Sequence, residues 1–264
     1  MNSATAKGAA HHLARARLER VRLDALSSDL APGDEDAAYI VQDALHERLT
    51  EAGKGAVSGH KIGCTTPIMQ RYLGIDSPCA GGVFEETAHH RSGTFAFDKL
   101  LHPGVECELA VRLNADLVPG DAPFDAASVA GAVGTVGPGI EIVDDRWVDY
   151  TTIDPPSLIA DDFFGAGCVL GDGLSNWREL DLAEVTGSMT INGKHVGSGS
   201  GAAILDHPLS ALAWLANLMA RRGRFLRAGE FVLLGSLVET KWVERGDLVE
   251  IDLGSLGGAT ARFV

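Results

Sequence analysis

Apolar positions recur at helical spacing through the first 55 residues of this chain. Residues 8–27, rich in Ala, Leu and Arg, predict one helix. A second helix is predicted after Asp34 or Asp36, because either aspartate can cap its amino end. The expected buried face of this helix comprises Ala38, Ile40, Val41, Leu45 and Leu49. An N-terminal helical segment over residues 1–55 is therefore expected.

From residue 56 onward, short apolar runs bounded by glycine replace the helical spacing. They predict strands at residues 57–64, 104–113, 139–145, 167–171, 188–197, 231–235, 248–254 and 259–264. Helical turns are predicted at residues 67–74, 125–134 and 207–223. Clustered strands with few helices predict an α+β fold around a mixed or rolled sheet, in one unit over residues 56–264.

Composition and charge exclude several classes of partner. The 264 residues carry a formal net charge of −14, which repels nucleic acid. No apolar run approaches the roughly 20 residues that span a bilayer, and no signal-peptide pattern is present. The four cysteines form no C-x-x-C pair and are expected to be reduced thiols. We expect a cytoplasmic protein with no nucleic-acid or membrane partner.

The glycine-rich stretch "GSGSGAA" at residues 197–203 loosely fits a dinucleotide-binding fingerprint. An acidic residue is missing at the required distance, since Asp206 comes too early and Glu230 too late. We therefore expect a flexible or close-packed loop here. The chain also has no Walker A motif and no G-x-S-x-G nucleophile elbow, so a serine hydrolase is unsupported.

Three glutamates lie in runs that are otherwise apolar. Glu106 and Glu108 in "GVECELAV" are two residues apart, so on a strand both side chains point to one face. Glu141 in "GIEIVDDRW" is a third acid on another apolar run. Salt bridges or exposure at a sheet edge can accommodate such carboxylates, and so can a hard divalent cation with oxygen ligands, Mg²⁺ or Mn²⁺.

Lys61 in "GHKIGCT" lies in an apolar, glycine-flanked strand. A desolvated amine with a lowered pKa is one interpretation, and a lysine that reaches the surface is the other. Three acids around a metal together with a buried lysine suit enolate chemistry. The metal would chelate a 2-oxo acid, and the lysine would move protons.

The chain resembles the 2-keto-4-pentenoate hydratase and 4-oxalocrotonate decarboxylase group of the fumarylacetoacetate hydrolase superfamily. The resemblance covers roughly residues 35 to 264. The matching segments, in chain order, are "KIGCT", "LGIDSPCAGGVF", "LLHPGVECELAV", "GIEIVDDRW", "SLIADD", "GSGSGAAILDHPLSALAWLAN", "LRAGEFVLLGS" and "LGGATARFV".

The resemblance implies a β-roll core of the fumarylacetoacetate hydrolase C-terminal type with peripheral helices. It also implies an active site dependent on Mg²⁺ or Mn²⁺, and a homo-oligomer. The family's metal ligands fall on Glu106, Glu108 and Glu141, and its active-site lysine falls on Lys61. Substrates of these enzymes are small 2-oxo or 2-hydroxydienoic acids from the meta-cleavage of aromatic rings.

Two departures from the family pattern concern proton transfer and substrate shape. Cys79 in "PCAG" takes the place of an acid that many hydratases carry, and a thiol is a poorer acid–base group unless its pKa is lowered. Asp162 in "ADDFFGAG" replaces an asparagine and precedes two phenylalanines. A reshaped substrate pocket and a simple packing change are both open. Cys79 and Asp162 are therefore further catalytic candidates.

Two more residues are substrate-binding candidates. Arg146 can orient a carboxylate, or it can be a structural partner of Asp144 or Asp145. Ser236, the last residue of "LRAGEFVLLGS", is the second candidate.

The favoured function is a metal-dependent lyase that adds water to a 2-hydroxy-2,4-dienoate, or its 2-oxo-3-enoate tautomer, through a metal-bound enolate. Alternatives within the superfamily are decarboxylation of a 4-oxalocrotonate-like 2-oxo diacid and C–C bond hydrolysis of an acylpyruvate. From a different class, the chain would be a catalytically idle subunit in a complex with a pathway enzyme.

Overall fold

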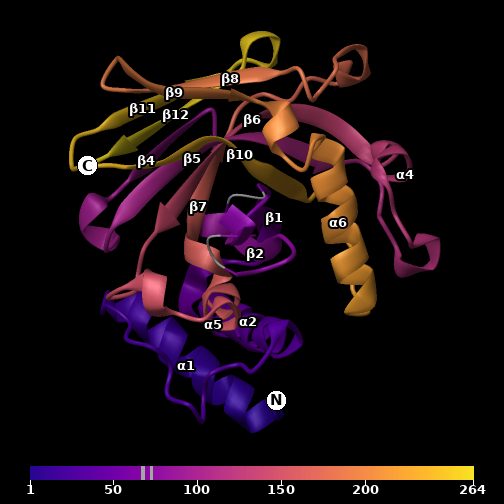
Figure 1. Ribbon diagram of the computed structural model, residues 1–264. Helices are drawn as coiled ribbons and strands as arrows, with labels where there is room; N and C mark the ends of the chain where they lie inside the picture. Colours follow the sequence, from indigo (N-terminus) through magenta and orange to yellow (C-terminus); the bar gives the residue numbers. More distant parts are fainter. Residues whose placement is uncertain (67–68, 72–73) are drawn as a thin grey trace.

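A mixed sheet of twelve strands forms the body of the molecule, and helices lie against it (Figure 1). The computed structural model describes residues 1–66, 69–71 and 74–264. The strands are β1 (Val57–Gly63), β2 (Cys79–Phe84), β3 (Ala88–His90), β4 (Ser92–Phe95), β5 (Pro103–Leu113), β6 (Val133–Asp144), β7 (Gly165–Leu170), β8 (Thr186–Ile191), β9 (Lys194–Ser200), β10 (Phe231–Trp242), β11 (Leu248–Asp252) and β12 (Gly258–Phe263). Their order in the sheet is β2-β1-β10-β5-β6-β7-β3-β4-β12-β11-β8-β9.

The sheet curls over itself. β8 and β9, at one end of the strand order, pack against β10, and β8 also packs against β5. Glycine permits this close approach, because a Cβ on Gly199 would lie 1.9 Å from the carbonyl oxygen of Leu237. The curled mixed sheet, with its parallel pairs β1–β10, β3–β7 and β4–β12, confirms the predicted α+β roll. The stretch predicted as a loop at 197–203 is close-packed, but its first four residues belong to β9.

Two helices of the N-terminal segment lie below the sheet in Figure 1. The first, α1 (Ser3–Glu19), begins and ends earlier than predicted. It stops because Arg20 adopts a left-handed conformation with φ of 58°, after which Leu23 forms a parallel bridge with Trp147. This bridge ties the segment that follows α1 to the chain beyond β6. The division of the chain at residue 55 stays a prediction.

The second helix, α2 (Glu35–Leu49), is capped by Asp34, which accepts a hydrogen bond of 2.8 Å from the Ala37 amide. Ile40 is 45% exposed, so its predicted burial is wrong. Tyr39 and Gln42 are buried instead, because both make hydrogen bonds to the backbone of Ala80 in β2. The buried face of the helix is therefore set partly by polar contacts to the sheet.

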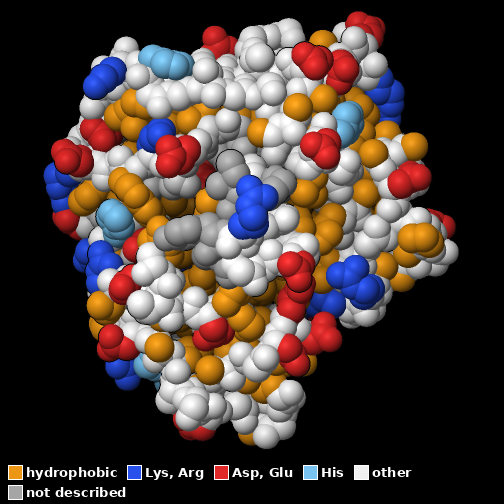
Figure 2. All heavy atoms as spheres, in the orientation of Figure 1, with side chains coloured by type: hydrophobic (Ala, Val, Ile, Leu, Met, Phe, Trp, Pro, Cys, Tyr) orange, Lys and Arg blue, Asp and Glu red, His pale blue; other side chains and the backbone are white. Residues whose placement is uncertain are grey.

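Three further α-helices with both ends in the described part of the chain are α4 (Ala126–Ala130), α5 (Pro155–Ala160) and α6 (Pro208–Arg221). α6 matches its prediction, whereas α4 is shorter than the predicted 125–134 because β6 already begins at residue 133. The turns predicted at 67–74 include residues 67–68 and 72–73, which lie outside the described residues. Within the described ranges, every helix is too short or too polar to cross a bilayer. On the face drawn in Figure 2, acidic, basic and apolar side chains are interspersed.

Candidate metal centre and active site

Three glutamates converge at the centre of the sheet, on β5 and β6. Glu106 lies directly opposite Glu141 in the antiparallel pairing of these strands. Glu108 is two residues further along β5 and so shares the face of Glu106. Each of the three side chains offers an oxygen, and these oxygens all lie within 4.8 Å of one another. Glu108 and Glu141 are buried, while Glu106 is half-buried.

Several oxygens of this cluster lack hydrogen bonds. Glu108 accepts a hydrogen bond of 3.0 Å from the Gly235 amide at Oε2, but its Oε1 has no partner. Both carboxylate oxygens of Glu141 are buried without a hydrogen bond of standard geometry, although Oε1 lies 3.1 Å from the Lys61 ammonium, so Oε2 is the oxygen left without a partner. Buried carboxylate oxygens that face one another are costly unless a cation lies between them. The donor set is all oxygen and carries three charges, so it fits a hard divalent cation such as Mg²⁺ or Mn²⁺.

Burial and mutual repulsion raise the pKa of two of these acids. Burial is the largest cause for Glu108, followed by the charges of Glu141 and Glu106, and together they raise its pKa well above the ordinary value. For Glu141, burial is again the largest cause, and it raises the pKa. The positive charge of Lys61 acts in the opposite direction, and the pKa is raised from 4.5 to about 7. The cluster without a cation therefore holds protons that a bound cation would displace.

We predict that the metal-free protein loses stability as the pH rises from 4.5 to about 7. In this window the folded state binds a proton at Glu141 more tightly than the unfolded chain does, so the free energy of unfolding falls with pH. Glu141 alone contributes a loss on the order of 3 kcal/mol, because one pKa unit corresponds to about 1.4 kcal/mol, and Glu108 acts in the same direction. Urea unfolding in a chelator at several pH values measures it. Stability that rises across this window would contradict the prediction.

Lys61 on β1 lies beside the cluster. Its Nζ is 3.1 Å from Oε1 of Glu141, and it donates a hydrogen bond of 3.1 Å to the carbonyl oxygen of Phe163. Burial alone would lower the pKa of Lys61, but the charge of Glu141, with smaller contributions from Cys79, Glu106 and Glu108, raises it instead. The lowered pKa considered from the sequence is therefore not found, because the sequence could not show how many acids surround the amine.

Cys79 and Ser236 lie on strands that flank the cluster. Cys79 on β2 is fully buried; burial, followed by its hydrogen bond with Cys64, raises the pKa of its thiol well above the ordinary value. This thiol stays protonated at neutral pH. Ser236 lies opposite Glu108 in the pairing of β10 with β5, and its hydroxyl donates to backbone carbonyls, one of them that of Cys107 at 3.3 Å.

Asp162 faces positive charge rather than the glutamates. Its Oδ1 lies 2.6 Å from Nε2 of His46 and accepts a hydrogen bond of 3.0 Å from the Gly82 amide. Its Oδ2 forms an ion pair of 3.1 Å with Nη1 of Arg17. Burial acts to raise the pKa of Asp162, but the neighbouring His46 and Arg17 lower it well below the ordinary range. Asp162 is therefore a buried carboxylate that stays ionised.

Arg146 also has a structural partner, and it is not the expected one. Its Nε donates to Oδ2 of Asp161 at 2.8 Å, and its Nη2 donates to the carbonyl oxygen of the same residue at 2.9 Å. Asp144 instead accepts hydrogen bonds from the amides of Leu101 and His102. Arg17 bonds the other oxygen of Asp161 at 2.7 Å. Two arginines and one histidine thus contact the aspartate pair 161–162.

The sequence did not reveal Arg17 and His46 as members of this network. They lie on α1 and α2, separated by 144 and 116 residues from the aspartates that they bind. A motif scan detects only local spacing, so these pairings give no signal in a single sequence. In the sequence, Arg17 and His46 are visible only as polar positions on the two N-terminal helices, with no indication of their partners.

The ion network holds a strained segment of backbone. Asp162, Phe163 and Phe164 all have positive φ, at 53°, 47° and 68°. Residues other than glycine adopt this region at a cost, and three in succession persist only where the surroundings fix them. The segment presents the Phe163 carbonyl to Lys61, and the Phe163 ring lies 5.6 Å from Nζ. The network therefore sets the position of the backbone that orients the buried amine.

We predict that Asp162→Asn lowers the free energy of unfolding by about 1–3 kcal/mol, because Asn keeps the hydrogen bond from Gly82 but leaves buried positive groups less compensated. Asp172→Asn is the matched control. Asp172 pairs with Arg91 at the surface, and exposed pairs contribute little. Urea unfolding of both variants checks the prediction, and equal losses would contradict it.

Comparisons with known proteins agree with this geometry. The chain matches the model of the family described as fumarylacetoacetate hydrolase C-terminal over residues 88–264. It is 32% identical over 256 residues to a 4-oxalocrotonate decarboxylase of Pseudomonas putida, covering 97% of this chain and 95% of the relative. It is 35% identical over 228 residues to a 2-keto-4-pentenoate hydratase of Paraburkholderia xenovorans, covering 86% and 83%.

A solved structure is similar over the entire chain. It is a 4-oxalocrotonate decarboxylase from Pseudomonas putida complexed with magnesium and adipate, with a TM-score of 0.92 and 30% identity. The match covers 100% of this chain and 99% of that one, so the N-terminal helices are included.

Proposed function

Since the chain belongs to the fumarylacetoacetate hydrolase C-terminal family, we propose that it is a divalent-metal-dependent lyase that hydrates a 2-hydroxy-2,4-dienoate or its 2-oxo-3-enoate tautomer. The observation that carries the proposal is the group of three glutamate oxygens within 4.8 Å, with Nζ of Lys61 3.1 Å from Glu141. Relatives named 2-keto-4-pentenoate hydratase support the substrate class.

Glu106, Glu108 and Glu141 would hold the cation. When bound, the cation supplies a Lewis acid for the carboxylate and 2-oxo oxygens of the substrate. Magnesium in a structure that matches the whole chain supports its identity.

Lys61 carries the mobile proton. Its Nζ is held between the Glu141 carboxylate and the Phe163 carbonyl, and its raised pKa keeps it charged at neutral pH. It therefore acts first as an acid: it protonates C5 of the 2-hydroxydienoate, and the proton of the enol O–H group returns to the amine, which gives the 2-oxo-3-enoate. Water then adds to the C=C bond conjugated with the 2-oxo group. Ser236, next to Glu108 in the strand pairing, is proposed to contact the substrate.

Decarboxylation of a 4-oxalocrotonate-like 2-oxo diacid is the second candidate, and Cys79 favours it. A buried thiol with a raised pKa supplies no base to activate water. Loss of CO₂ needs no attacking water, so the thiol is no obstacle to it. A relative and a solved structure that each match nearly the whole chain are 4-oxalocrotonate decarboxylases. This coverage does not separate the two reactions, because a 2-keto-4-pentenoate hydratase matches 96% of the chain as well.

A substrate panel followed by NMR distinguishes these reactions. The protein is incubated with Mg²⁺ and 2-hydroxypentadienoate, 4-oxalocrotonate or an acylpyruvate. A 4-hydroxy-2-oxo product supports hydration, release of CO₂ supports decarboxylation, and pyruvate with a second acid supports C–C hydrolysis. Turnover of none of the three, with or without Mg²⁺ or Mn²⁺, would reject the lyase proposal. Light scattering of the same sample tests the proposed homo-oligomer.

A further inference from the structure

A cavity lies apart from the three glutamates. It has a volume of about 560 Å³, and neither the glutamates nor Lys61 lines it. It lies among α1, the strands β2, β4 and β7, and the turn at residues 97–99 that follows β4. A cavity of this size accommodates a small organic molecule.

Basic side chains dominate the charge of this cavity. The five that line it are Arg17, Arg20, Lys54, Lys99 and Arg146. The two acids that line it already have partners. Glu86 pairs with Lys54 at 2.8 Å, and Asp144 accepts the amides of Leu101 and His102. Arg17 and Arg146 pair with Asp161 and Asp162, and Lys54 pairs with Glu86, so Arg20 and Lys99 carry the uncompensated positive charge of this concave surface.

Three of the basic groups have capacity left for a ligand. Nη2 of Arg17 is buried and has no hydrogen-bond partner, although Nε and Nη1 are bound to Asp161 and Asp162. Arg20 makes only a long contact of 3.5 Å to a carbonyl oxygen. Lys99 is exposed and forms no ion pair with the acids of the described residues. A buried guanidinium nitrogen without an acceptor is costly, and an anion would satisfy it.

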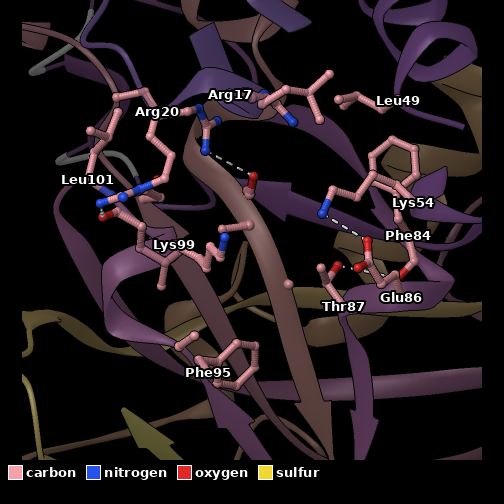
Figure 3. Close-up of a pocket in the computed structure, with 18 of the residues that line it drawn as sticks. Arg17, Arg20, Leu49, Lys54, Phe84, Glu86, Thr87, Phe95, Lys99 and Leu101 are labelled. Carbon is pink, nitrogen blue, oxygen red and sulfur yellow. Dashed lines mark hydrogen bonds and ion pairs between the residues drawn. The ribbon is translucent and has the colours of Figure 1, made fainter. Parts of the chain in front are cut away.

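Apolar side chains, among them Phe84 and Phe95, line the cavity between the basic groups, together with the polar Thr87, His89 and Thr94. Figure 3 shows Arg20 and Lys99 on one side of the cavity and Lys54 with Phe84 on the other, while Phe95 lies below them. A ligand that reaches both sides therefore needs negative groups at two ends and an apolar body between them.

We propose that this cavity binds a small organic dianion with an apolar body, at a site separate from the glutamate cluster. One anionic group lies against Arg20 and Lys99, and the other approaches Lys54, where it competes with Glu86 for the ammonium group. The site does not depend on the proposed reaction, because none of its residues belongs to the glutamate cluster.

Isothermal titration calorimetry of the full chain in a chelator tests the proposal, with isophthalate as probe. The chelator removes any cation that would hold a carboxylate at the glutamates, and the Glu108→Gln variant below checks that the measured heat reports another site. We expect wild-type protein to bind isophthalate at least about tenfold more tightly than benzoate, which has one carboxylate, and the affinity to fall with added salt. Absence of binding, or equal affinity for both probes, would overturn the proposal.

Variants locate the site. The double variant Arg20→Gln/Lys99→Gln changes two exposed side chains, so the fold is retained, and it should weaken isophthalate binding at least about tenfold. Lys194→Gln on β9 is the matched control and should bind like wild type. Glu108→Gln should also bind like wild type. Unchanged binding by the double variant, or loss of binding in Glu108→Gln, would place the anion elsewhere and refute the assignment.

Discussion

Glu108→Gln is expected to lower turnover by about 10³-fold while raising the stability of the metal-free protein. The turnover loss follows from weaker cation binding, since a loss of about 4 kcal/mol corresponds to that factor. The stability gain follows because Gln keeps an oxygen for the Gly235 amide and, unlike Glu108, needs no proton to stay neutral beside Glu106 and Glu141. We expect a gain of about 1–3 kcal/mol in chelator. Mg²⁺ should then stabilise the variant much less than wild type.

Thermal unfolding with and without Mg²⁺, and steady-state kinetics, measure both effects. Glu239→Gln is the matched control, because Glu239 lies on β10 with a side chain that is 87% exposed. It should change neither turnover nor stability. A Glu108→Gln variant that is less stable than wild type in chelator would show that the three carboxylates do not repel one another as their geometry indicates.

Lys61→Met is expected to lower turnover by about 10²–10⁴-fold without reducing cation affinity. Methionine fills a similar volume but cannot carry the proton, and general acid–base groups contribute rate factors of this size. The variant also removes a positive charge 3.1 Å from Glu141, so the carboxylates should bind a cation at least as tightly as before. Titration with Mn²⁺ and deuterium exchange at C3 of a 2-oxo acid separate the two effects.

One result of the exchange experiment would contradict the prediction for Lys61. Deuterium exchange at the wild-type rate in Lys61→Met would remove the proton-transfer role of this lysine. Loss of exchange together with loss of Mn²⁺ binding would show damage to the whole site instead. Lys194→Met replaces an exposed lysine on β9 and should leave exchange and binding unchanged.

Local patterns predicted most of the architecture. Alternation placed β1 and β5, and helical spacing placed α6, because each of these elements buries a face that its own sequence marks. The predictions failed where distant contacts decide the boundary. α1 ends where Leu23 pairs with Trp147, and α2 buries Gln42 because it bonds to Ala80. Neither partner lies within the window that a periodicity analysis reads.

Some features of the candidate site are likewise visible in the local sequence, while others depend on distant contacts. Two glutamates at strand spacing and a lysine in an apolar run are visible in the sequence, and the fold brings them together. The direction of the Lys61 pKa depends on four neighbours from three other strands, so sequence spacing could not supply it. The environment of Asp162 was equally hidden, since its cations come from helices at the other end of the chain.

The long separation of these partners bears on how the chain folds. Arg17 and His46 are synthesised early, but their aspartates follow 144 and 116 residues later. During synthesis α1 and α2 thus remain without their buried counter-charges until β6 and α5 have formed. Non-local pairings of this kind slow folding, because the intervening loop must close before the contacts stabilise it. The helices at the start of the chain are therefore expected to dock among the last native elements.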